Sequence, residues 1–248
     1  MEKKQKKEKS GKTTSTIKTV ETSETNNKNI KNKLLESKIG LINAGGSCYM
    51  ASIIQILIHL KQFLDIFIKN EYSNNFSNEF YKFIKNLSQS KYPIEINTIA
   101  DEYNLINKKF CGEEGNNPMT FFTEFIKELS KDNKEVLNIF KGQKVFNFED
   151  IKEYTEDFLF HLVILDRYND NITELLNNGR IFENKNKYKY KKDLKPTLLE
   201  KITTNPEILI INLELENITY NGEEYIVVGD NSYELVAINK YTNYHSIA

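Results

Sequence analysis

Cys48 is the residue whose surroundings best suit a nucleophile. It follows Gly45-Gly46-Ser47 and opens a strongly apolar segment with helical spacing. At a helix start, N–H groups and the positive end of the helix dipole favour the reactive thiolate. The glycines also allow a substrate backbone to approach the sulfur closely. Because most free cysteines are small core residues, Cys48 by itself indicates catalysis only weakly.

A catalytic thiol needs a base, normally histidine, and the chain has three. His59 is expected on the helix that Cys48 opens, about 16 Å further along, which is too far for contact. His161 lies in an apolar run and is predicted to be a core histidine with its ring bonded to backbone. His245 follows a polar turn, from which it can project over a helix terminus. It is the best candidate, the alternative being an exposed histidine at a strand end.

Helices are predicted in the first half of the domain. The apolar residues after Cys48 predict one buried helix from about Cys48 to Lys69. Two further helices are predicted over Phe76–Ser88 and Met119–Ser130, with Pro118 in the first turn of the latter.

The second half changes to short apolar runs that are typical of strands. Phe158–Leu165 suits a strand covered on both faces, and Glu207–Leu213, after Pro206, predicts a central strand. A short helix is expected over Ile172–Asn177. The remaining predicted segments are the strands Tyr225–Val228, Tyr233–Asn239 and Tyr244–Ala248, with a polar turn at Asn239–Asn243. Helices first and antiparallel strands later predict an α+β fold.

Residues 1–38 are predicted to form a disordered, low-complexity tail. Met1–Thr25 has almost no large apolar side chains, so burial cannot offset the entropy lost on ordering. The basic opening at residues 2–9 suits a nuclear address or a solvated tail. The sequence changes character at Ile39, and residues 39–248 are predicted to form one domain.

Composition excludes several functional classes. Lys+Arg total 34 and Asp+Glu 35, a net charge of -1 that argues against a dedicated nucleic-acid binder. No apolar run reaches the roughly 18 residues of a membrane helix. The two cysteines, Cys48 and Cys111, cannot build a disulfide framework or a zinc site of CxxC pairs. We therefore expect no metal, cofactor or membrane, and a reducing cytoplasmic or nuclear location. Cys111, in a polar loop, is predicted to be incidental.

The segment Gly40–Leu57 reads G-L-I-N-A-G-G-S-C-Y-M-A-S-I-I-Q-I-L. It resembles the cysteine box of ubiquitin-specific proteases, G-L-x-N-x-G-N-T-C-Y-M-N-S-x-x-Q-x-L, with Gly46, Ser47 and Ala51 as the exceptions. Weaker likenesses follow in the family's order, so that the resemblance spans residues 39–248. They lie at Asn117–Phe122, Ile139–Gly142, Phe158–Leu165, Asn205–Ile211 and Tyr233–Ala248.

This resemblance implies a papain-like cysteine protease fold. Its helical thumb would cover about residues 39–138, and an antiparallel β palm with reduced, zinc-free fingers about residues 139–248. It also implies a thiol-dependent deubiquitinase that hydrolyses (iso)peptide bonds after the C-terminal glycine of ubiquitin, with ubiquitin or ubiquitinated proteins as partners. Residue by residue, Cys48 matches the nucleophile, His245 the general base, and Asn43 the residue whose amide donates to the oxyanion.

Other features depart from the family pattern. The family's third catalytic group, an Asp or Asn beyond the histidine, has no counterpart before Ala248, as expected of a truncated C-terminus. Tyr244 replaces the glycine before the histidine, and Asn117 replaces an acidic residue. The stretches near Asn147–Lys152 and Tyr188–Lys192 lack the zinc-binding cysteines. The alternative function is a catalytically impaired module that binds ubiquitin, a ubiquitin-like protein or another protein.

Overall fold

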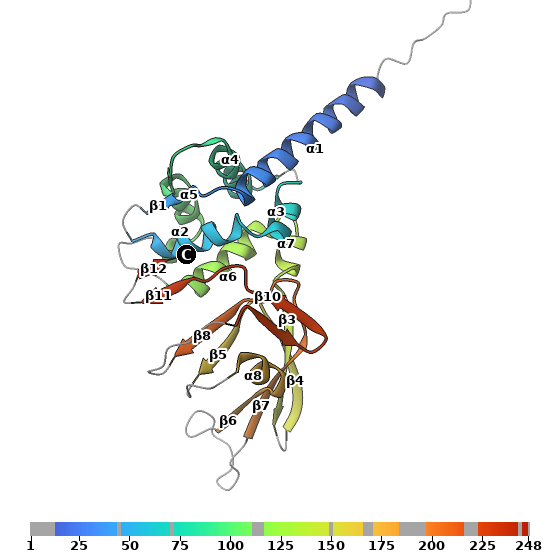
Figure 1. Ribbon diagram of the computed structural model, residues 1–248, viewed down its shortest axis with the longest axis vertical. Coiled ribbons are helices and arrows are strands. Elements are labelled where there is room, and N and C mark those ends of the chain that lie inside the picture. Colours follow the sequence, from blue (N-terminus) through green and yellow to red (C-terminus); the bar gives the residue numbers. More distant parts are fainter. Residues whose placement is uncertain are drawn as a thin grey trace, which may run out of the picture.

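Most of the helices lie in one lobe and most of the strands lie in another (Figure 1). The computed structural model describes residues 13–43, 46–69, 72–110, 117–148, 151–165, 171–183, 197–215, 223–242 and 245–247. The helical lobe comprises α1 (Thr13–Leu35), β1 (Leu41–Ile42), α2 (Cys48–Leu57), α3 (Lys61–Phe67), α4 (Asn75–Gln89), β2 (Ile94–Glu95), α5 (Asn97–Ile106), the 3₁₀ turn η1 (Lys108–Phe110), α6 (Pro118–Leu129) and α7 (Glu135–Asn138). The predicted mixture of helices first and strands later is confirmed.

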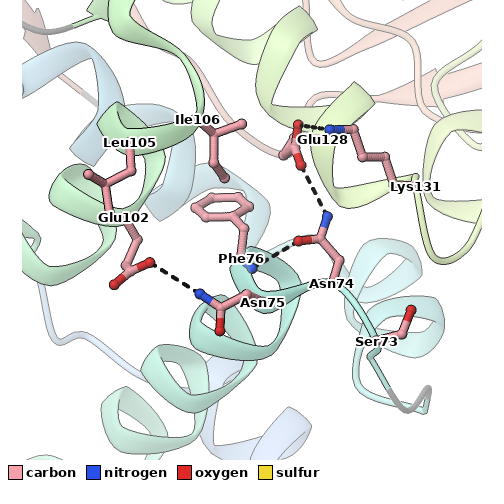
Figure 2. Close-up of a pocket in the computed structure, with 9 residues that line it drawn as sticks. All are labelled: Ser73, Asn74, Asn75, Phe76, Glu102, Leu105, Ile106, Glu128 and Lys131. Atoms are coloured by element: carbon pink, nitrogen blue, oxygen red, sulfur yellow. Dashed lines mark hydrogen bonds and ion pairs between the residues drawn. The ribbon is translucent and has the colours of Figure 1, made fainter.

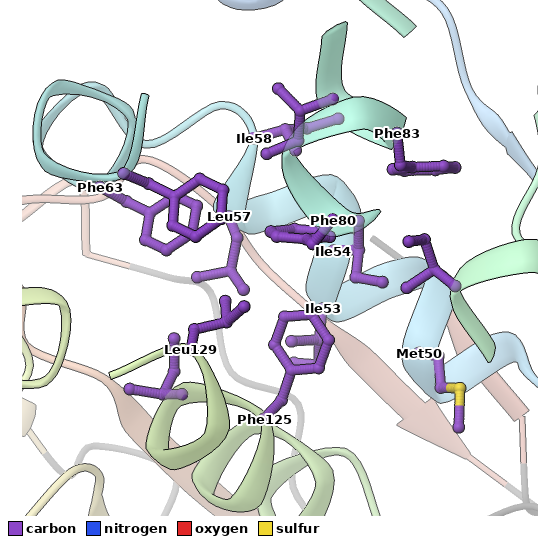
Figure 3. Close-up of a cluster of buried hydrophobic side chains, with 14 of the residues drawn as sticks. Met50, Ile53, Ile54, Leu57, Ile58, Phe63, Phe80, Phe83, Phe125 and Leu129 are labelled. Carbon is purple, nitrogen blue, oxygen red and sulfur yellow. The ribbon is translucent and has the colours of Figure 1, made fainter. Parts of the chain in front are cut away.

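The core of the helical lobe lies where α2, α4 and α6 meet (Figure 3). Ile54 of α2 and Phe80 of α4 are fully buried there. Phe125 of α6 stands edge-on to Phe80, with ring centroids 5.1 Å apart. Each such side chain contributes about 1.5–3 kcal/mol by leaving water. The predicted helices Phe76–Ser88 and Met119–Ser130 are thus confirmed as α4 and α6, and Pro118 lies in the first turn of α6.

The prediction of one continuous helix from Cys48 to Lys69 is wrong. The segment forms two helices, α2 and α3, that meet at 85°. A ring nitrogen of His59 lies 2.7 Å from the carbonyl oxygen of Gln55, which the His59 N–H would bond in a continuing helix. That N–H bonds the carbonyl of Ile56 instead, which tightens and ends α2. Within the described ranges, no single helix has the length and apolar character to cross a membrane, and α2 with α3 meets that test only as a bent pair.

Helix α1 differs from the predicted disordered tail. Ile30 and Leu34, one turn apart, are buried in the core of the helical lobe. The Tyr81 hydroxyl of α4 donates to Oδ1 of Asn27, at 3.3 Å. The prediction weighed the polar first 25 residues and overlooked this apolar pair, whose burial holds the end of the helix. Residues 1–12 lie outside the described residues.

Asp65 of α3 joins α1 to the helical lobe. Its carboxylate pairs with Lys31 of α1 and, at 2.8 Å, with Lys61 of its own helix. Burial acts to raise the pKa of Asp65, but the hydrogen bonds and charges of the two lysines outweigh it and hold that pKa below its ordinary value.

Replacing Asp65 with asparagine is expected to lower the free energy of unfolding by about 1 kcal/mol at neutral pH, because the bonded charge is lost. A lowered folded-state pKa stabilises the fold above the unfolded value, near 3.9, and this stabilisation disappears as pH falls through the folded value. In thermal melts, the difference between the variant and wild type should therefore be full at pH 7 and should shrink as the pH is lowered below about 4. Glu79→Gln, which breaks an exposed pair with Lys82, serves as the control. An equal effect of both variants would contradict the role of Asp65.

The strand lobe contains one four-stranded sheet and smaller pairs. The four-stranded sheet has the order β4-β3-β7-β6, all antiparallel, and β5 and β8 pair in parallel. The elements are β3 (Gly142–Phe148), β4 (Ile151–Phe158), β5 (His161–Leu165), α8 (Ile172–Asn178), β6 (Arg180–Glu183), β7 (Thr197–Thr204), β8 (Ile211–Leu215), β9 (Tyr225–Val228) and β10 (Asn231–Glu234). The last two strands, β11 (Lys240–Thr242) and β12 (His245–Ile247), lie beside α2 at the edge of the helical lobe (Figure 1). Because β5 and β8 are parallel, the expectation of purely antiparallel strands is wrong.

A second hydrophobic cluster lies between α8 and the strands. Leu176 of α8 packs there with Val163 of β5 and Val228 of β9. Asn177 fixes the β9–β10 hairpin to α8, since its side chain donates to the carbonyl of Val227 at 2.6 Å and accepts from the Gly229 N–H at 2.8 Å. Gly229, with φ of +59°, makes the two-residue turn of that hairpin.

Several predicted strands are shifted. Phe158–Leu165 is divided between the end of β4 and the whole of β5, and the strand predicted at Glu207–Leu213 begins only at Ile211. The strand predicted at Tyr233–Asn239 ends at Glu234, and β11 occupies most of the predicted polar turn. Apolar runs do not mark where a chain turns between partners, so strand ends depend on pairing. Helix α8 and β9 lie where they were predicted.

Gly142, the first residue of β3, leaves no room for a side chain. A Cβ atom there would lie 2.9 Å from the carbonyl oxygen of Thr204 and would overlap the ring of Phe158. Gly142→Ala is therefore expected to destabilise the protein by about 1–3 kcal/mol, measured by urea unfolding. Gly40→Ala is the matched control, because nothing lies within 4 Å of its added Cβ. Equal stability of Gly142→Ala and wild type would show that this contact relaxes without cost.

Candidate functional site

Cys48 is the first residue of α2 and is buried, with 6% of its surface exposed. Its neighbour Tyr49 anchors this end of the helix in the core. The Tyr49 hydroxyl donates to the carbonyl of Phe110 at 3.2 Å, and its ring lies edge-on to Phe121 with centroids 5.4 Å apart. The sulfur is therefore attached to a helix end whose position is fixed by packing.

The segment before Asn43 is tied to α2 and to the turn after it by two side chains, Gln55 and His59. Nε2 of Gln55 donates to the carbonyl of Ile39 at 3.3 Å. Nε2 of His59 lies 3.1 Å from the carbonyl oxygen of Ser37. Strand β1 then pairs in parallel with β2, which places Leu41 opposite Ile94. Residues 37–42, which lead to Asn43, are thus held by the bonds of Gln55 and His59 and by the pairing of β1 with β2.

From the sequence, His59 is excluded as the base and is assigned no other role. Its spacing of four residues from Gln55, in an otherwise apolar segment, is the signal that could have suggested a shared structural task.

Asn43 lies in the loop between β1 and α2 and is exposed. Its Oδ1 accepts a hydrogen bond of 2.8 Å from the hydroxyl of Ser47, the residue directly before the cysteine. Gly46 between them has φ of +20°, at the edge of the left-handed region that residues with side chains rarely adopt. The loop therefore brings the Asn43 amide back toward the start of α2.

His245 opens β12, which is the segment that reaches α2 from the far end of the chain. Strand β12 pairs antiparallel with β11, with His245 opposite Thr242. The backbones of β12 and α2 approach within 8 Å between Cα atoms. In Figure 1 the two elements lie together at the edge of the helical lobe. The segments that carry the predicted nucleophile and base are thus neighbours.

The other residues considered from the sequence have structural positions. His161 is 5% exposed and stands beside the ring of Phe158, at 5.7 Å between centroids, so its predicted core position is confirmed. Asn117 caps α6, since its Oδ1 accepts from the N–H groups of Met119 and Thr120 at 2.8 and 3.2 Å. Gly45, Cys111, Tyr244 and Tyr188–Lys192, together with residues 149–150, lie outside the described residues.

A shallow pocket lies elsewhere in the helical lobe (Figure 2). Its lining comes from the start of α4 and the ends of α5 and α6, with none of residues 43–48 and 245–247. Glu128 in its wall pairs with Lys131 at 2.6 Å and accepts from the Asn74 amide at 3.0 Å. These polar groups hold α4 to α6, so the pocket is a junction between helices. In the part of the chain that the structure describes, no three His, Cys, Asp or Glu side chains gather as metal ligands would.

Comparison with known proteins places most of the chain in one family. The sequence model described as ubiquitin carboxyl-terminal hydrolase matches residues 39–239, which is most of the chain. A search of curated proteins found no match.

Two similar solved structures contain the SAGA Ubp8/Sgf11/Sus1/Sgf73 DUB module. In one the module is bound to ubiquitin aldehyde, with a TM-score of 0.55, 20% identity, and coverage of 71% of this chain and 47% of that chain. In the other, with a Ubp8 variant, it is bound to monoubiquitin, with a TM-score of 0.53, 17% identity and the same coverages. The chain spans about half the length of these neighbours, and likeness at such identities shows the fold.

Proposed function

Because this chain belongs to the ubiquitin carboxyl-terminal hydrolase family, we propose that it is a thiol-dependent deubiquitinase. Its substrates are ubiquitin conjugates, and it hydrolyses the peptide or isopeptide bond after the C-terminal glycine of ubiquitin. In this proposal the helical lobe is the thumb of a papain-like fold, and the strand lobe forms the palm and zinc-free fingers.

The proposed chemistry uses three residues. The Sγ of Cys48 forms a bond to the carbonyl carbon while its proton moves to His245, and the carbonyl π electrons move to oxygen. The Asn43 amide and the Cys48 N–H donate to this oxyanion. Collapse expels the amine, which takes the proton from His245, and leaves a thioester. Water then attacks the thioester in the same way and releases the carboxylate and the thiol.

The observation that carries the proposal is the packing of β12 against α2. Cys48 opens α2 and His245 opens β12, so a sulfur and an imidazole from opposite ends of the domain belong to adjacent backbones. Asn43 adds an amide donor to the same end of α2 through its bond to Ser47. Nucleophile, base and oxyanion donor are the groups that acyl transfer requires.

The direct test is labelling with ubiquitin that carries an electrophile at its C-terminus. We expect one covalent adduct, and peptide mapping should locate it on Cys48. An adduct on Cys111, or no adduct with folded protein, would overturn the hydrolase proposal. Ubiquitin binding without an adduct would instead support a binding module that lacks turnover.

A further inference from the structure

We infer that Ser47 is a positioning residue for the oxyanion donor: its hydroxyl holds Asn43 so that the amide NH₂ group faces the reacting carbonyl. This inference rests on the proposed function. It assigns a role to Ser47, which stands where the family's cysteine box has a threonine.

The bond of Ser47 to Asn43 differs from the bond that a serine usually makes at this position. Ser47 is the N-cap of α2, where a serine oxygen commonly accepts from an N–H group of the first turn. The Ser47 side chain makes no such cap bond. Its hydroxyl donates to Oδ1 of Asn43 at 2.8 Å. The Ser47 hydroxyl therefore bonds the Asn43 amide and does not cap the first turn of the helix.

The direction of this bond determines which end of the Asn43 amide points toward Ser47. An asparagine amide has an accepting oxygen and a donating nitrogen, and a half-turn about its last bond exchanges them. Only the nitrogen end can donate to an oxyanion. When the Ser47 hydroxyl donates to Oδ1, the oxygen is fixed on the serine side and Nδ2 faces away from it.

The bond also couples the donor to the nucleophile. Ser47 directly precedes Cys48, and the end of α2 is fixed by Tyr49 in the core. Asn43 itself is exposed, and exposed side chains exchange rotamers readily. A bond to the residue beside the sulfur holds the donor at a constant distance from the reacting carbon, which is what preorganised oxyanion stabilisation requires.

Two ubiquitin probes separate this role from a general structural one. With ubiquitin aldehyde, the sulfur adds to the carbonyl carbon and the thiol proton ends on the oxygen, giving a hemithioacetal whose oxygen needs the Asn43 donor. With a ubiquitin alkyl halide, the sulfur displaces halide, which leaves with its bonding electrons, while the thiol proton passes to the base. No oxyanion forms in the second reaction.

We expect Ser47→Ala to weaken aldehyde binding about 3- to 10-fold and to lower kcat on a ubiquitin C-terminal amide by the same factor, with KM unchanged. The rate of alkylation should stay within twofold. Ser47→Thr should recover most of the loss. In an Asn43→Ala background, itself about 10²- to 10³-fold slower, Ser47→Ala should have no further effect. Ser130→Ala, which removes a hydroxyl bonded to Lys127, is the control.

Two results would overturn the inference while leaving the proposed function intact. One is an equal loss of alkylation and aldehyde binding in Ser47→Ala, which would mean that the serine acts on the sulfur or the helix. The other is an undiminished effect of Ser47→Ala in the Asn43→Ala background. Absence of alkylation of Cys48 in the wild type would instead overturn the proposed function, and this inference with it.

Discussion

Replacing Cys48 with alanine is expected to abolish hydrolysis of a fluorogenic ubiquitin C-terminal amide. The sulfur is the only atom of the protein that forms a bond to the substrate carbon in the proposed mechanism. Without it no thioester forms, and kcat should fall on the order of 10⁴-fold or more, to the background rate. The variant should still fold, because removing one buried sulfur atom lowers the free energy of unfolding by only about 1 kcal/mol. Steady-state kinetics and a thermal melt of the same sample check both statements.

The matched control is Cys111→Ala, which removes the chain's other thiol. It should hydrolyse the amide at the wild-type rate. Loss of activity in Cys111→Ala, with activity kept in Cys48→Ala, would move the nucleophile to the other cysteine. Binding of ubiquitin to Cys48→Ala, measured by calorimetry, should persist, because the substitution removes only the atom that would react and leaves the rest of the surface unchanged.

The second large effect is expected from His245→Ala. General acid–base catalysis by a positioned imidazole contributes about 10²- to 10⁴-fold, and kcat/KM should fall by that factor. In the proposed mechanism the imidazole also takes the thiol proton, and without it the reaction depends on the few per cent of thiolate that an unassisted thiol has near neutral pH. The residual activity of the variant should therefore keep rising above pH 8, where wild-type activity has levelled. A pH profile of kcat/KM from pH 5 to 9.5 measures the difference.

Added imidazole should restore part of the activity of His245→Ala by occupying the space of the lost ring. His161→Gln, which alters a buried histidine beside Phe158, is the control and should keep the wild-type shape of the pH profile. A wild-type pH profile in His245→Ala would show that His245 is not the base. It would not contradict Cys48 as the nucleophile.

The helical lobe was the part of the fold most open to prediction from sequence. Apolar residues at helical spacing identified α4 and α6 closely, and Pro118 marked the start of α6. The break between α2 and α3 could not be predicted, since it depends on a ring of His59 that reaches the carbonyl of Gln55 and a chain segment at Ser37. Helix α1 was missed because Ile30 and Leu34 are buried only by a partner surface on α3 and α4.

The strand lobe was less predictable for a physical reason. Strand pairing joins residues that are far apart in the chain, so β5 with β8 and β3 with β7 depend on tertiary contacts that no local pattern contains. The run Phe158–Leu165 is apolar throughout, yet it divides where the chain leaves one sheet for another. Local composition specified that strands would form but not where each would end.

The amino-acid sequence alone determined the reactive types: a cysteine at a helix start, a late histidine and an asparagine five residues before the thiol. Cys48 and His245 were chosen from their places in the predicted elements, and Asn43 from the resemblance of residues 40–57 to the family's cysteine box. Only the tertiary structure brought β12 beside α2 and turned the Ser47 hydroxyl to Asn43. Both arrangements depend on the relative positions of separate segments in the folded chain, and packing across the whole domain determines those positions.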